Sequence, residues 1–156
     1  MKPEEIFFRY AYPCSDCLVM LGTITEEEKK ELEKKFNNNQ CPTRKELKEY
    51  YPAAFERIKK VAKTMKKEPW NIEVIREYFI DEHNGVIDRS EGNYKLLPKS
   101  MKDICKVYIA EVIDKKNNIL TVRYDHTQRR VLDNLVKDTK VGDKVTVHYG
   151  FAIEKL

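Results

Sequence analysis

The last third of the chain holds short runs of strand-forming residues separated by turn residues, and this pattern limits the possible fold most. The runs span residues 107–113, 119–124, 129–132, 144–149 and 151–153. The first two flank the turn-like stretch 115–118 and predict a hairpin. About five strands within ~50 residues favour a small OB-like antiparallel β-barrel, because closing a sheet removes its exposed edges.

The first half of the chain has apolar residues at helical spacing and explicit helix start signals. Thr25 with Glu28, and Thr43 with Glu46, have the spacing of a capping box. Pro3 suits a first helical turn, and residues 53–65 place their apolar side chains on one face. We expect further short helices before Gly22 and over residues 72–80, the last of them stopped by Asn84 and Gly85.

From residue 85 to about residue 102 the apolar residues follow neither a helical nor a strand period, and residues 88–93 are typical of a loop. The predicted organisation is therefore a helical domain at 1–85, a linker at 86–102 and a small barrel at 103–156. The predicted fold class is α+β.

Composition limits the classes of partner. The formal net charge of +4 comes from 30 basic and 26 acidic residues that are interleaved, which does not demand a nucleic-acid partner. The N-terminus lacks the layout of a signal peptide, and no apolar run approaches the ~20 residues of a membrane span. We expect a cytoplasmic protein with no membrane partner, in which cysteines are thiols or ligands. Abundant Glu and Lys with little Gln is typical of proteins that stay folded when hot.

The closing run, residues 141–153, carries the most specific motif. Its characteristic residues are Gly142, Asp143, His148, Gly150, Phe151 and Ala152. Together with Arg130 and Val131, these residues resemble the closing signature and the central strand motif of the HypC/HupF family of hydrogenase-maturation chaperones. Cys105 falls where that family has its essential cysteine. The resemblance covers roughly the last third of the chain and leaves the helical domain unrecognised.

The resemblance implies a non-enzymatic chaperone whose partners are a maturation scaffold protein or the large subunit of a nickel-iron hydrogenase. It implies that Cys105 and His148 are the functional pair, with an iron-dicyanide-carbonyl group, Fe(CN)2CO, held transiently at Cys105. A thiolate and an imidazole are suitable ligands for such iron. Because Val145 and Val147 alternate with His148, we expect this histidine on the more polar strand face, available to a ligand or partner.

This sequence departs from the family at its cysteine. The family's cysteine normally becomes the N-terminal residue, whereas Cys105 is internal, so a mechanism that uses an adjacent free amine is excluded. The alternative interpretations are a buried apolar role for Cys105 and a plain surface position for His148.

A second set of potential ligands lies in the helical part. Cys14 and Cys17 form a C-x-x-C pair that, with Cys41 and His83, predicts a tetrahedral zinc site as one interpretation. The other interpretation places Cys17 in the helical core, and a redox dithiol is a further alternative.

A nucleic-acid-binding barrel is the alternative function. Basic residues at 57–67 and 126–130, with Tyr108, Tyr124 and Tyr149 as stacking platforms, would suit single strands. The low net charge favours a solvated face instead. The sequence contains no Gly-rich phosphate loop, nucleophile elbow or spaced carboxylate pair that predicts an enzyme.

Overall fold

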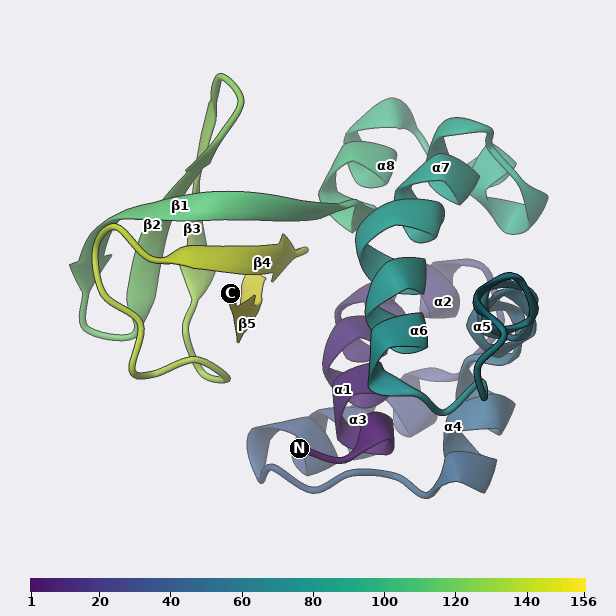
Figure 1. Cartoon of the computed structure of the whole chain (residues 1–156). Coiled ribbons are helices and arrows are strands. Elements are labelled where there is room, and N and C mark those ends of the chain that lie inside the picture. The colour runs from purple at the N-terminus through teal and green to yellow at the C-terminus, as the bar shows by residue number, and fades with distance from the viewer. The chain divides into compact units, whose positions relative to one another are not determined.

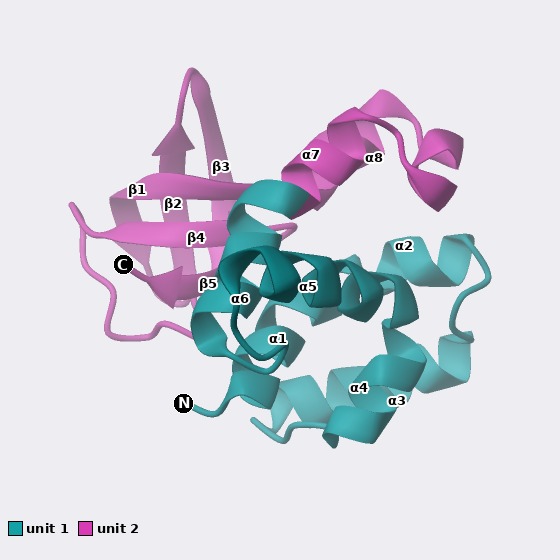
Figure 2. Cartoon of the chain, turned by 45° about the vertical axis from the view of Figure 1, so that its right-hand side comes forward, with its two compact units in different colours: residues 1–82 teal, residues 83–156 magenta.

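The computed structural model describes residues 1–156 and has the predicted α+β architecture, with helices first and strands last (Figure 1). The chain forms two compact units, Met1–Glu82 and His83–Leu156 (Figure 2). The predicted helical domain, 1–85, ends three residues beyond the first unit, and the predicted linker, 86–102, lies within the second unit. The predicted domain bounds stay a prediction. None of the helices has the length and apolar character to cross a membrane.

The first unit consists of helices that begin where the sequence signals place them. They are α1 (Pro3–Ala11), the 3₁₀ helix η1 (Tyr12–Cys14), α2 (Ser15–Met20), α3 (Glu26–Asn37), α4 (Arg44–Tyr50), α5 (Pro52–Met65), α6 (Ile72–Glu77) and the π-helical turn η2 (Tyr78–Glu82). Both predicted capping boxes are formed, at Thr25 and at Thr43. The core includes the fully buried Phe7 and Tyr10 of α1, whose rings pack on Phe79.

The second unit opens with short helices. They are α7 (His83–Asp88), the 3₁₀ helix η3 (Gly92–Leu96) and α8 (Lys99–Cys105). The predicted helix stop at Asn84 and Gly85 is wrong, because both residues lie inside α7. The Asn84 side chain, which favours helix ends when it bonds to its own backbone, bonds instead to Val107. Residues 85–102 lack a sequence period because their helices are only five to seven residues long.

The strands follow the predicted runs and close into a barrel in the order β1-β2-β3-β5-β4. Their bounds are β1 (Val107–Lys116), β2 (Ile119–Tyr124), β3 (Thr127–Leu132), β4 (Lys144–His148) and β5 (Phe151–Lys155). All pairs are antiparallel except β3 with β5, which meet in parallel at Leu132 and Phe151. In a ring of five strands the alternation of direction must fail once, so the barrel is mixed. The OB-like description stays a prediction.

The barrel interior is filled by one cluster of small and branched side chains. Its buried members are Ala110, Val112, Leu120, Val122, Val131, Val136, Val145, Val147 and Ala152. Val145 and Val147 belong to β4, so the residues that alternate with them, Thr146 and His148, lie on the outer face of the barrel. This register decides the direction of the His148 ring.

Candidate functional site

His148 is the last residue of β4, and the structure brings it to the start of β1. The two strands are antiparallel, with His148 opposite Val107. The ring nitrogen Nε2 of His148 lies 2.9 Å from the backbone carbonyl oxygen of Cys105. Because a carbonyl oxygen only accepts hydrogen bonds, Nε2 carries the proton and donates it. The predicted functional pair is therefore adjacent, and the contact runs through the backbone of Cys105.

Cys105 ends α8 and is fully buried, with a side chain that has no exposed surface. Its carbonyl group is among the last four of the helix, which have no partner within the helix itself. His148 supplies a donor to this carbonyl, as side chains near helix C-termini often do. The Cys105 thiol does not join His148 in any group of three or more potential metal ligands.

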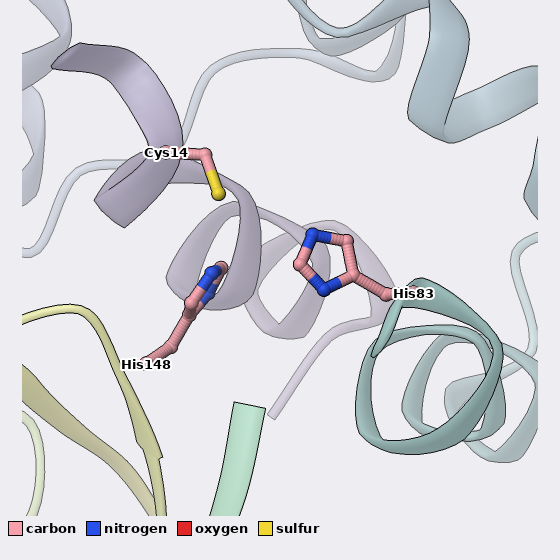
Figure 3. Close-up of side chains that lie close together, drawn as sticks. All are labelled: Cys14, His83 and His148. Carbon is pink, nitrogen blue, oxygen red and sulfur yellow. The ribbon is translucent and has the colours of Figure 1, made fainter. Parts of the chain in front are cut away.

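The structure corrects the expected exposure of His148. The side chain is on the outer face of the barrel, as the alternation predicts, yet it is completely buried. Its ring packs edge-on against the ring of His83, with centroids 5.3 Å apart and planes inclined by 74° (Figure 3). An outer strand face is polar only where water reaches it, and here another imidazole lies on it.

His83, the first residue of α7, is held by two further contacts of its unit. Its Nε2 lies 3.3 Å from the hydroxyl oxygen of Tyr94, and the two rings meet edge to face at 6.1 Å. The side-chain nitrogen Nδ2 of the next residue, Asn84, donates to the Val107 carbonyl oxygen at 2.7 Å. The Asn84 side-chain oxygen Oδ1 accepts from the Val107 N–H at 2.8 Å. Since Val107 is opposite His148, this clamp places His83 beside His148.

The two histidines form a buried pair of potential ligands. One ring nitrogen of His83 and one of His148 lie within 4.8 Å of each other. Figure 3 shows the two rings directed toward one another from α7 and from β4; Cys14, drawn there too, belongs to the helical unit. Neutral imidazole nitrogens bind zinc, iron, nickel and copper ions. Sequence reasoning grouped His83 with the cysteines as a potential zinc ligand, because no local pattern links α7 to β4.

The closing run builds the turns that position β4. Gly142 has a φ of 92°, which favours glycine, and its N–H donates to the Val112 carbonyl oxygen at 2.8 Å. The Asp143 carboxylate accepts from the Lys140 N–H and pairs with Lys155. The hydrogen bond from Lys155, the largest contribution, and that from Lys140 lower the pKa of Asp143.

The rest of the run joins β4 to β5. The carbonyl oxygen of Gly150 accepts from the Leu132 N–H at 2.8 Å, and Phe151 pairs with both Leu132 and His148. Ala152 is buried in the barrel core. These residues close the barrel immediately beside His148.

Comparison with known families recognises the part of the chain that contains the barrel. The model of the HupF/HypC family matches residues 105–156. The C-terminal third of the chain is of the HupF/HypC type. No curated protein matches the chain. HupF/HypC proteins are chaperones of hydrogenase maturation, which supports a chaperone-type role at the level of the family.

The match begins at Cys105 and ends with β5, so it contains both residues of the predicted pair. His83, Asn84 and Tyr94 precede the HupF/HypC segment. Sequence reasoning that starts from the family therefore reaches His148. It misses His83, whose ring packs against His148, and Tyr94, which contacts His83.

The three cysteines of the helical unit lie apart from this pair in the sequence and differ in their surroundings. Cys14, at the end of η1, and Cys17, in α2, are buried, and Cys41 is half-buried. The Cys41 thiol donates to the Pro42 carbonyl oxygen at 3.2 Å. Burial first, and then the charges of Glu4 and Glu5, raise the pKa of Cys41 to about 12. Neither Cys17 nor Cys41 joins a group of three potential metal ligands, and zinc at Cys14 and Cys17 stays a prediction.

The tyrosines proposed as stacking platforms have other contacts. Tyr108 and Tyr124 stack on each other, with centroids 4.1 Å apart and planes at 17°. Arg129 donates to the Tyr124 hydroxyl at 3.3 Å and also to the carbonyl oxygen of Tyr149. Because Tyr108 and Tyr124 each cover one face of the other, they do not form two separate platforms for successive bases.

Proposed function

We propose that this chain is a non-enzymatic accessory protein of hydrogenase maturation, which binds a maturation scaffold protein or a hydrogenase large subunit. The observation that carries the proposal is the HupF/HypC segment, whose closing run holds His148 against Cys105. The helical unit adds a second folded body that is available for docking.

Within this proposal, the iron group of the hydrogenase is cargo that Cys105 and His148 handle. A thiolate is a soft ligand that suits low-valent iron, and an imidazole nitrogen adds a second donor. Cys105 and His148 are both buried, so cargo reaches them only when the residues around them move apart. The internal position of Cys105 leaves the thiolate as its only side-chain donor, without a neighbouring amine.

The proposal is tested by affinity purification of the tagged chain from its native cell, followed by mass spectrometry of bound proteins. We expect a maturation scaffold or a hydrogenase large subunit, with less of either in Cys105→Ala and His148→Ala. Cys41→Ala is the matched control, because Cys41 is a partly buried thiol outside the HupF/HypC segment.

Two results count against the proposal in different ways. Recovery of no hydrogenase-related protein would overturn the assigned function. Full recovery by both the Cys105→Ala and His148→Ala variants would overturn the part played by these two residues, while leaving the docking role in place.

A further inference from the structure

We infer that His83 and His148 together form a two-imidazole site for a divalent transition-metal ion. Both residues lie in the second unit, and their exposed fractions are only 2% and 0%. Their rings meet edge to face, with centroids 5.3 Å apart. His83 precedes the HupF/HypC segment, so the site is an addition to what that family brings. Identifying the ion as the iron of the maturation cargo rests on the proposed function; metal binding itself does not.

The Cys105 carbonyl determines which nitrogen of His148 is the ligand. Because Nε2 donates its proton to that carbonyl oxygen at 2.9 Å, a neutral ring carries its lone pair on Nδ1. Metal-binding histidines typically hold their second ring nitrogen in this kind of hydrogen bond, which orients the ring and increases its basicity. His148 is therefore arranged as an Nδ1 ligand before any ion arrives.

His83 is oriented by equivalent means. The Tyr94 hydroxyl lies at hydrogen-bond distance from Nε2 of His83, and the clamp between Asn84 and Val107 fixes the backbone at the next position. A ring that is held at one nitrogen by an outer hydroxyl matches the second-shell arrangement around metal-bound imidazoles. Both rings of the pair thus have an outer partner.

The separation of the rings suits one shared ion. Bonds of 2.0–2.1 Å to a tetrahedral ion place two ligand nitrogens about 3.3 Å apart. One ring nitrogen of His83 and one of His148 lie within 4.8 Å of each other, so about 1.5 Å of approach or less is enough.

Two protein ligands leave two positions of a tetrahedral ion open for groups that the ion brings or a partner supplies. That ligand number fits a site that passes its ion on, because fewer protein bonds must break at release. The ligand type favours zinc, iron, nickel or copper over magnesium or calcium, which prefer oxygen.

The test uses the full chain, purified without metal and titrated with Co²⁺, whose binding is measured by its visible absorption. Zn²⁺ is then added as a competitor. The chain has only three histidines, and His126 is exposed in the β2–β3 turn, so His126→Ala is the matched control. We expect about one equivalent of Co²⁺, binding lost in His83→Ala and His148→Ala, and no change in His126→Ala. Tyr94→Phe should weaken binding by roughly 10–100-fold, the usual effect of losing an outer-shell partner.

Imidazole NMR signals provide a second measurement that does not depend on the variants folding. Zn²⁺ should shift the signals of two of the three histidines and leave that of His126 in place. The inference is overturned if the wild-type chain binds no Co²⁺, if His83→Ala binds as the wild type does, or if only one histidine signal responds. Metal binding without recovery of a hydrogenase-related partner would uphold the site and remove only the proposed function.

Discussion

Replacing Asn84 with Ala should destabilise the second unit, because one side chain there holds two elements together. Its amide makes two hydrogen bonds to the backbone of Val107, at 2.7 and 2.8 Å, and Val107 is 2% exposed. The substitution leaves a buried N–H and a buried carbonyl oxygen without their Asn84 partner. Each such loss costs about 1–3 kcal/mol, so we expect a total of about 2–6 kcal/mol.

Urea unfolding combined with amide hydrogen exchange measures this effect. With an m value of about 2 kcal/mol/M, the midpoint should fall by roughly 1–3 M. The Val107 amide should lose protection even before global unfolding, because it loses its acceptor. Asn134→Ala, at an exposed turn, is the control. A midpoint shift equal to that of Asn134→Ala, with Val107 still protected, would refute the clamp.

Three other variants or groups have definite expected responses. Gly142→Ala should lower the free energy of unfolding, measured by thermal denaturation, by about 1–2 kcal/mol, because alanine is strained at a φ of 92°. Gly150→Ala, at a glycine whose φ is not positive, should be neutral, and equal effects of the two variants would contradict this reasoning. At about pH 8, the rate of Cys41 alkylation should be roughly a thousandfold lower than that of a thiol of ordinary pKa, and the rate should keep rising as the pH approaches the Cys41 pKa of about 12. A rate that levels off near pH 9 would contradict the raised pKa. Hydrogen bonds from Thr43 and then Lys35 lower the pKa of Glu46 from 4.5 to about 2. Because its pKa is lower in the folded chain, Glu46 stabilises the fold above about pH 4.5, and this contribution is lost as the pH falls to about 2. The loss of stability over this pH range should be smaller in Glu46→Gln than in the wild type, whereas Glu49→Gln should behave as the wild type does.

Local signals predicted the main helices of the first unit and the strands of the barrel. The capping boxes at Thr25 and Thr43 bring together residues three positions apart, so the sequence shows both partners at once. The strands are visible because their turn residues and their apolar alternation are also local. The closing run also carries the resemblance to the HupF/HypC family, and it contains His148.

Contacts between distant parts of the chain could not be predicted in this way. Asn84 has the composition of a helix stop, and only its partner Val107, 23 residues further on, explains why α7 continues. The burial of His148 has the same origin. Alternation along β4 correctly gives the face of the strand, but what lies on that face depends on α7, which carries no periodic signal.

The position of Cys105 inside the chain has a structural consequence beyond the loss of a free amine. As the last residue of α8, it presents a carbonyl group that the helix leaves without an internal partner. His148 donates to that carbonyl, which places its lone pair on Nδ1. The helices α7 and α8 thus both act on His148, since the end of α8 sets the proton position and α7 supplies the second imidazole. A variant that breaks α8 near its end, such as Ile104→Pro, should therefore disturb the imidazole signals of His148 more than those of His126.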